Sequence, residues 1–113
     1  MVIFAPEMAT DLREGMRGGA GAARLTALSA QLPAHMRLFS TITLAPGSGI
    51  GYHVHEGETE LFYFISGKGR VQDDADWVAV SAGDCMSTPS GHGHAVENTG
   101  EEDLILLAAI VLD

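Results

Sequence analysis

The sequence has few of the features that would tie it to nucleic acid or to disulfide chemistry. Six Lys and Arg residues stand against fifteen Asp and Glu residues, which gives the 113-residue chain a net charge of −9. This charge has the wrong sign for holding a polyanion, and no local cluster of basic residues offsets it, so we expect no nucleic-acid partner. The single cysteine, Cys85, cannot form an intrachain disulfide.

Long apolar runs are also missing. The N-terminal run Val2–Ala5 is interrupted by Pro6 and Glu7 before it could serve as a signal segment or a membrane span. We therefore expect a cytoplasmic protein that does not associate with a membrane. Heptads, repeats of solenoid period and low-complexity tracts are absent too.

What the chain does contain is a series of short strand patterns punctuated by Gly, Pro and Asp. Its length suits one domain, residues 1–113, with one core. Residues 6–17 carry a weak helical pattern that ends in small residues at 18–21, and residues 1–35 are expected to form an N-terminal arm and a first strand. Strands are predicted at 24–29, 36–45, 50–55, 60–66, 68–73, 76–80, 84–88, 93–98 and 103–112. This spacing favours an all-β antiparallel barrel or sandwich.

Two of the predicted strands are apolar on both faces. Residues 61–65 and 104–112 are apolar almost without interruption, whereas a strand with one wet face would alternate. Something must cover their outer faces. We expect a homodimer, in which a partner's sheet or N-terminal arm provides this cover. The alternative is that residues 6–30 of the same chain fold back over them.

Four of the five histidines fall in two clusters, and these give the strongest functional signal. His53 and His55 are two residues apart, so both imidazoles point to the same face of one strand. Residues 56–59 suit a turn, after which a returning strand could bring the Glu60 carboxylate back beside them. The second cluster, His92 and His94, then supplies a fourth ligand from across the interior. The pattern predicts one metal site built from two hairpins.

The spacing around these clusters resembles the two signature motifs of the cupin superfamily. The first motif is matched by Gly47, His53, His55, Glu60 and Gly67, and the second by Gly83, Pro89, Gly91, His94 and Asn98. The motifs cover residues 47–98 directly. The resemblance implies a double-stranded β-helix, or jelly-roll, barrel over residues 36–112, similar to the compact single-domain microbial cupins. It also implies the metal ligands, which are His53, His55, Glu60 and His94.

Several alternatives stand beside this ligand set. The cluster could be an empty polar network held by hydrogen bonds. His92 could replace His94 only if the strand begins by residue 92. Gly91 and Gly93 indicate that His92 is still in a turn, so we assign it to the rim of the substrate pocket.

Two neighbouring carboxylates compete with Glu60 for the fourth position. Glu60 lies on the same face of the predicted strand as Phe62 and Phe64, which would line the barrel interior. We therefore expect Glu56 and Glu58 to face solvent.

Three imidazoles and one carboxylate suit one divalent transition metal ion, namely Mn, Fe, Co, Ni or Zn. This set leaves about two octahedral positions open, and open positions mark catalytic rather than structural sites. Such an ion can act as a Lewis acid, lower the pKa of bound water, or chelate an α-hydroxy acid or a dicarboxylate. Because the ligands are neutral imidazoles, we predict metal loss below about pH 6.

The pocket around this ion is expected to be small and mostly apolar. Its predicted wall consists of Phe62, Phe64, Met86 and Val96. Arg37 could pair a substrate carboxylate through both arms of its guanidinium. The alternative is that Arg37 faces solvent, because strand alternation puts it opposite Leu38, Ile42 and Leu44.

Three functional hypotheses follow. The leading one is a metal-dependent enzyme that decarboxylates, oxygenates or isomerises a small carboxylate or oxygenated metabolite, all chemistries found in proteins this sequence resembles. Its only candidate catalytic carboxylate is Glu60, beside a metal-bound water. The alternative is a non-catalytic protein that binds a small carboxylate or sugar at the metal. In a third, structural role, the cluster only stiffens the barrel.

Overall fold

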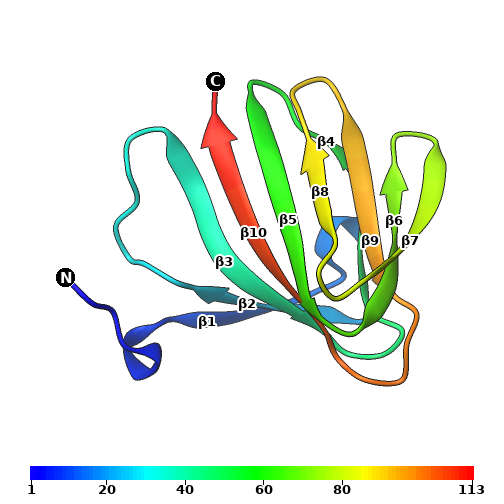
Figure 1. Ribbon diagram of the computed structural model, residues 1–113, viewed down its shortest axis with the longest axis horizontal. Helices are drawn as coiled ribbons and strands as arrows, with labels where there is room; N and C mark the ends of the chain where they lie inside the picture. The colour runs from blue at the N-terminus through cyan, green and yellow to red at the C-terminus, as the bar shows by residue number, and fades with distance from the viewer.

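Two antiparallel sheets that face each other make up the computed structural model, which describes residues 1–113 (Figure 1). The strands are β1 (Thr10–Glu14), β2 (Ala22–Ala27), β3 (Met36–Leu44), β4 (Gly49–Val54), β5 (Glu58–Ser66), β6 (Lys68–Asp73), β7 (Asp76–Ser81), β8 (Cys85–Thr88), β9 (Gly93–Asn98) and β10 (Leu104–Leu112). Two short 3-10 turns, η1 (Ala5–Glu7) and η2 (Met16–Gly18), complete the chain. No helix is long and apolar enough to cross a membrane.

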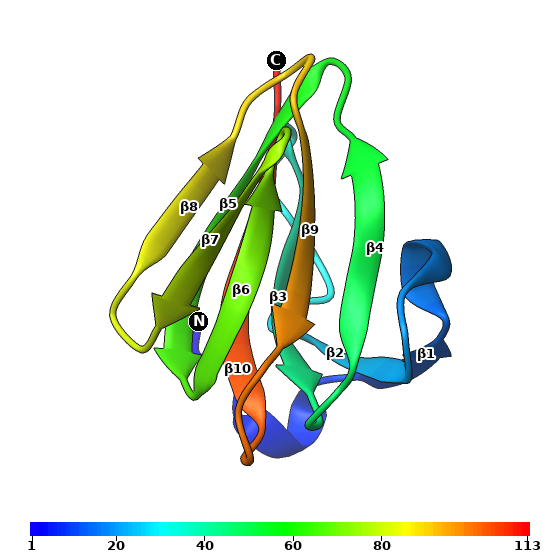
Figure 2. The same ribbon diagram turned by 90° about the vertical axis from the view of Figure 1, so that its right-hand side faces the viewer.

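The strand order is that of a jelly roll. One sheet runs β1-β2-β3-β10-β5-β8 and the other runs β4-β9-β6-β7. Consecutive strands β3 and β4 therefore belong to different sheets, as do β8 and β9, and Figure 2 shows the two sheets closing around one interior. The all-β jelly-roll class predicted from the sequence is confirmed.

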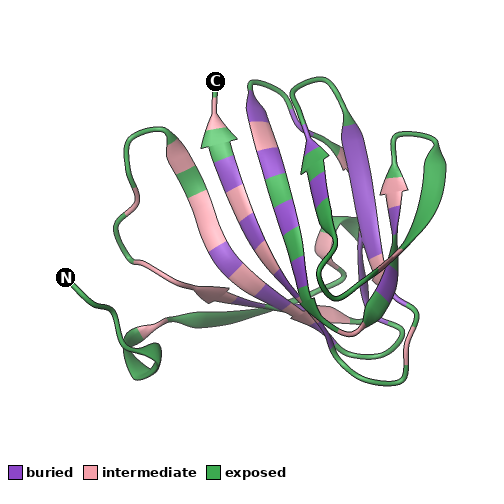
Figure 3. Ribbon diagram, in the orientation of Figure 1, coloured by how far each residue is buried: buried purple, intermediate pink, exposed green.

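The core lies between the two sheets and follows from strand alternation. On β5, the buried Phe62 and Phe64 alternate with the exposed Leu61, Tyr63 and Ile65, which gives this strand its banded pattern in Figure 3. The largest fully buried apolar side chains are Phe64, Ile42, Leu44, Leu104, Leu106 and Val96. Burial of these side chains is the main driving force that holds the sheets together.

The N-terminal region departs from the sequence prediction. Residues 10–14 form strand β1 rather than helix, because every residue of β1 pairs with β2, from Thr10 opposite Thr26 to Glu14 opposite Ala22. No residue of β1 is buried, so the weak helical spacing of apolar residues did not reflect a packed face. β1 and β2 extend the larger sheet beside β3.

This arrangement leaves the outer face of β5 without cover from the same chain. Leu61, Tyr63 and Ile65 are 40%, 48% and 46% exposed. The alternative to a homodimer, that residues 6–30 fold back over this face, is wrong, because β2 pairs with β3 at the far side of β10 and continues the sheet sideways.

Strands β4 and β3 each contain a β-bulge. On β4, Ile50 pairs with Val96 but His53 pairs with His94, so β4 carries one extra residue between them. On β3, Leu38 pairs with Ile110 but Met36 pairs with Val111, which leaves Arg37 as the extra residue. A bulge changes the face to which the following side chains point.

Candidate metal centre

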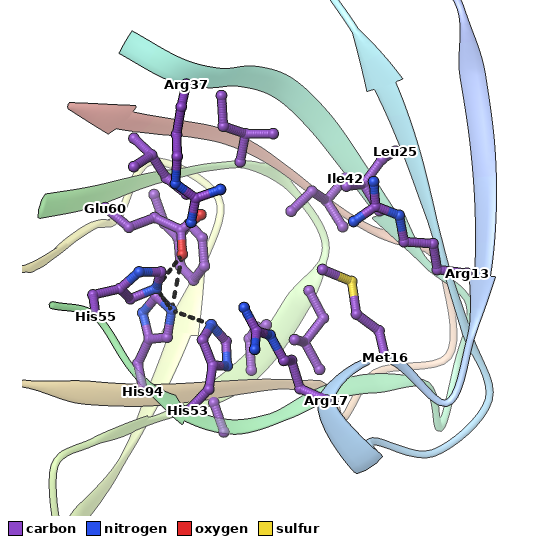
Figure 4. A pocket seen from close by; sticks show the side chains of 16 residues that line it. Arg13, Met16, Arg17, Leu25, Arg37, Ile42, His53, His55, Glu60 and His94 are labelled. Carbon is purple, nitrogen blue, oxygen red and sulfur yellow. Dashed lines mark hydrogen bonds and ion pairs between the residues drawn. The ribbon is translucent and has the colours of Figure 1, made fainter. Parts of the chain in front are cut away.

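Four side chains from three strand regions converge inside the barrel (Figure 4). His53 lies on β4, His55 directly after it, Glu60 on β5 and His94 on β9. One potential ligand atom from each residue lies within 4.8 Å of all the others. Nε2 of His55 and Nε2 of His94 each lie 2.9 Å from Oε1 of Glu60. The structure therefore brings together all four residues that the cupin resemblance implied as ligands.

The opposite side of each imidazole ring is already occupied. Nδ1 of His53 donates to the carbonyl oxygen of Gly51 at 2.8 Å, and Nδ1 of His55 donates to Oε2 of Glu58 at 2.6 Å. Nδ1 of His94 lies 2.8 Å from the hydroxyl of Thr88, which can accept in the same way. These partners hold a proton on Nδ1 and leave the Nε2 lone pairs free to bind.

The free lone pairs point at one another. Nε2 of His94 lies 3.1 Å from Nε2 of His55 and 3.2 Å from Nε2 of His53. Lone pairs at this separation repel, and a cation placed among them removes the repulsion. Outer partners that fix Nδ1–H are also the usual support of metal-bound histidines. The residues present therefore fit a metal ion.

The donor set decides which ions fit. Three imidazole nitrogens and one carboxylate oxygen suit divalent transition metals better than Ca²⁺ or Mg²⁺, which prefer oxygen ligands. Burial lowers the pKa of His53, although its bond to the Gly51 carbonyl opposes this, and the nearby charge of Arg17 contributes a smaller lowering. A lowered pKa keeps His53 neutral and able to bind metal to a lower pH than an ordinary histidine.

The bulge on β4 determines that His53 and His55 point to the interior. Ile50 and His53 both line the interior cavity although they are three residues apart, which regular alternation forbids. The extra residue lies at Gly51–Tyr52 and turns His53 inward, and His55 follows on the same face. Tyr52 is 45% exposed, and its hydroxyl end lies against Gly93.

Glu58 is the residue whose role sequence reasoning missed. The prediction that it faces solvent is wrong, because it is buried and its carboxylate accepts hydrogen bonds from both His55 and Arg37. The bond from the Arg37 guanidinium is the main reason why the pKa of Glu58 falls to about 2, and His55 lowers it further. Strand β5 begins at Glu58 and not at residue 60, so Glu58 shares the inward face with Glu60. Glu56 is exposed, as expected.

Arg37 points inward despite its position in the alternation of β3. Its Nε and Nη2 donate to the two carboxylate oxygens of Glu58 at 2.7 and 2.6 Å. The alternative, in which strand alternation puts Arg37 on the face opposite Leu38, fails because the bulge makes Arg37 the extra residue of β3. It lines the mouth of the cavity, with 47% of its side chain exposed.

The cavity beside the histidines has a volume of about 80 Å³. This is below the range of roughly 300–1,000 Å³ for sites that take drug-sized ligands, so the space suits a molecule of a few heavy atoms. Of the predicted apolar wall, Phe62 and Val96 line it, and the ring of Phe62 stacks on His94 with centroids 4.8 Å apart. Phe64 and Met86 are buried in the core but do not line the cavity.

His92 lies outside this cavity, so its assignment to the pocket is corrected. β9 begins at Gly93, which leaves His92 in the preceding turn. Its side chain is exposed and bonds to the carboxylate of Asp74 at 2.6 Å. This bond raises the pKa of His92 and, together with the Gly93 backbone amide, lowers that of Asp74. The pair joins the β6–β7 turn to the β8–β9 connection on the surface.

The sequence interpretation also missed the contribution of the N-terminal region to the cavity. Arg13, Met16 and Arg17 line it from β1 and the turn η2 (Figure 4). The two arginines together with Arg37 are half of the six basic residues of the chain. No sequence motif marks them, because their place at the site depends on how β1 and β2 join the sheet.

Comparisons with known proteins agree with this architecture. The family model described as "Cupin domain" matches residues 40–110. An oxalate-binding protein of Thermotoga maritima is 40% identical over 99% of this chain and 94% of its own length. A crystal structure from the same organism, of a protein described as a predicted oxalate decarboxylase, superposes with a TM-score of 0.95 at 39% identity and full coverage of both chains.

A more distant relative is the oxalate decarboxylase of Bacillus subtilis. It is 37% identical over 58% of this chain, but the match covers only 18% of that longer protein. The family model covers more than half of the chain, over the same strands that carry the four clustered ligand groups. The chain belongs to the cupin family.

Proposed function

We propose that this protein binds one divalent transition metal ion through His53, His55, Glu60 and His94, and that it uses the ion to bind a small dicarboxylate of the oxalate class. The observation that carries the proposal is the convergence of three Nε2 atoms and one carboxylate oxygen beside a small cavity lined by arginines. A bound ion of this kind supplies a Lewis acid for carboxylate oxygens. The oxalate-binding relative, which matches nearly the whole chain, supports the ligand class.

Binding is the function that the geometry supports best. Among the residues that line the cavity, Glu60 is the only carboxylate, and it belongs to the proposed ligand set. Glu58 is tied to Arg37 and His55. Neither carboxylate is therefore free to act as a general acid or base on a bound ligand.

Isothermal titration of oxalate tests this proposal directly. We expect protein loaded with Mn²⁺ to bind oxalate and protein stripped with a chelator and then dialysed to lose that binding. Glu60→Gln should lose it as well, whereas Glu56→Gln, which changes an exposed carboxylate in the neighbouring turn, should bind as the wild type does. No oxalate binding by the loaded protein, or equal binding by the stripped protein, would refute the proposal.

A second candidate function is decarboxylation of the bound dicarboxylate. The match to the Bacillus subtilis oxalate decarboxylase favours it. The same metal-loaded protein, incubated with oxalate, would then release CO₂ at a rate that disappears in His55→Ala. Stable binding of oxalate without CO₂ release would leave binding as the function.

We also propose that two copies pair through the outer face of β5 and β10. This face carries no charged side chain on either strand, and its exposed apolar residues are Leu61, Tyr63, Ile65 and Val111. Burial of such a patch in a symmetric pair removes it from water. Light scattering after size exclusion should give the mass of a dimer, and Ile65→Asp should give a monomer. The matched control, Val78→Asp, changes an equally exposed residue of the other sheet. A monomeric wild type at micromolar concentration would contradict the pairing.

A further inference from the structure

The turn between β1 and β2 is built to lie against the mouth of the cavity. η2 packs on β4, and Figure 2 shows the turn beside that strand. Gly51 makes this approach possible, because a Cβ atom there would overlap the carbonyl oxygen of Arg17. Gly19 plays the same part from the other side, since its Cβ would overlap the carbonyl oxygen of Gly49.

This close approach fixes Arg17 at the cavity. Its backbone adopts a left-handed conformation with φ of 54°, which is uncommon for residues other than glycine. In Figure 4 the guanidinium lies beside His53 and faces the cavity. A backbone conformation that costs energy persists only where the surrounding structure holds it, here the contact of the turn with β4.

Arg17 differs from the other two cavity arginines in its pairing. Arg13 is paired with Asp11 at 2.8 Å, and Arg37 is paired with Glu58 through both of its arms. Arg17 has no carboxylate within ion-pair distance and its side chain makes no hydrogen bond. In a chain with fifteen acidic residues, an arginine left free beside a cavity is available for an anion from solution.

The charges around the cavity then indicate how many negative charges the ligand carries. Arg13 and Arg37 are neutralised by their partners, and the three histidines bind metal in the neutral form. With a divalent ion in place, Glu60 offsets one of its two positive charges. Arg17 restores a second positive charge, so the complete site matches a dianion, whereas a site without Arg17 matches a monoanion.

We propose that Arg17 determines the specificity of the site for dianionic ligands, by binding the oxygen atoms of the dicarboxylate that face away from the metal position. The inference rests on the proposed function. The guanidinium fork presents two parallel N–H donors, which suits carboxylate oxygens. Arg17 thereby makes the site discriminate between a dicarboxylate and a monocarboxylate of similar size.

Titration calorimetry of Mn²⁺-loaded protein with oxalate and with glycolate tests this. The two ligands are of similar size, but oxalate carries two negative charges and glycolate one. Arg17→Gln should weaken oxalate binding by about 10- to 100-fold, the range expected for a hydrogen bond between charged groups. Glycolate affinity should change by less than about threefold, and Arg17→Lys should recover part of the oxalate affinity. Arg24→Gln is the matched control, because Arg24 is exposed on β2 and does not line the cavity.

The outcomes separate this inference from the proposed function. Tight oxalate binding by the wild type that is unchanged in Arg17→Gln, or an equal loss for oxalate and glycolate, would overturn the role of Arg17 and leave metal-dependent binding intact. A wild type that binds neither ligand would overturn the proposed function and this inference with it. Metal content and thermal melting of each variant check that the fold and the metal site persist.

Discussion

Replacing Glu58 alters a side chain that contacts His55 but does not reach the proposed metal position. Oε2 of Glu58 accepts the Nδ1–H of His55 at 2.6 Å, which fixes the tautomer that presents Nε2 to the ion. A hydrogen bond to a charged group contributes about 1.5–3 kcal/mol. Loss of such an outer partner lowers metal affinity by about 10- to 100-fold, which corresponds to about 1.4–2.7 kcal/mol. The two ranges agree.

We therefore expect Glu58→Gln to weaken Mn²⁺ binding by about tenfold, because the amide oxygen still accepts from Nδ1–H but carries no charge. Glu58→Ala should approach a 100-fold loss, since it removes the acceptor altogether. Competition with a chelating dye measures both constants, and Glu56→Gln serves as the control because Glu56 is exposed. Affinity of Glu58→Ala within twofold of the wild type would show that the outer hydrogen bond does not prepare His55 for the metal.

Three further predictions concern pH and the turn η2. Bound metal should be lost as the pH falls below about 6, because protons then compete for the imidazoles. The lowered pKa of His53 lets this ligand keep the metal to a lower pH than an ordinary histidine would. Full metal occupancy after exhaustive dialysis at pH 4 would contradict this prediction. Because the pKa of Glu58 is lowered to about 2 in the folded protein, its carboxylate contributes fully to stability above the usual pKa of 4.5, and this contribution is lost as the pH falls toward 2. In urea unfolding of metal-free protein, the wild type should therefore be more stable than Glu58→Gln at pH 7, by a margin that shrinks by pH 3. A margin that does not depend on pH would contradict this. Gly51→Ala should displace Arg17 and weaken oxalate binding, because the new methyl group overlaps the Arg17 carbonyl oxygen. Wild-type oxalate affinity of this variant in calorimetry would mean that the contact between η2 and β4 does not hold Arg17 at the cavity.

Much of the fold could be predicted because strand alternation and turn residues are local signals. β6 and β9 have the predicted bounds, β3 and β10 differ from them by one residue at one end, and β4 is shifted by one residue at both ends. The N-terminal residues could not be predicted in this way, because β1 has no buried residue and owes its strand conformation to pairing with β2. That pairing joins residues 10–14 to residues 22–26, and the sequence of β1 alone does not reveal it.

The residues at the site likewise include some that could be predicted from the sequence and some that could not. The four clustered ligand groups could be recognised because their spacing repeats a known motif. Arg37 could be named as a candidate but its direction could not be decided, and Arg17 could not be recognised. The direction of Arg37 depends on a bulge opposite β10, and Arg17 reaches the cavity only because Gly51 has no side chain. Glu58 was within reach of sequence reasoning. It stands two residues before Glu60, and a strand that begins two residues earlier puts both carboxylates on one face.

The decisive measurement for the metal site is the metal content of protein purified without chelator and without a nickel column, obtained by inductively coupled plasma mass spectrometry. We predict close to one transition metal ion per chain in the wild type and in Glu56→Gln, and little or none in His53→Ala and Glu60→Ala. A wild type that stays free of metal even after incubation with Mn²⁺, Fe²⁺, Co²⁺, Ni²⁺ and Zn²⁺ would contradict this prediction, as would equal metal content in the wild type and both ligand variants.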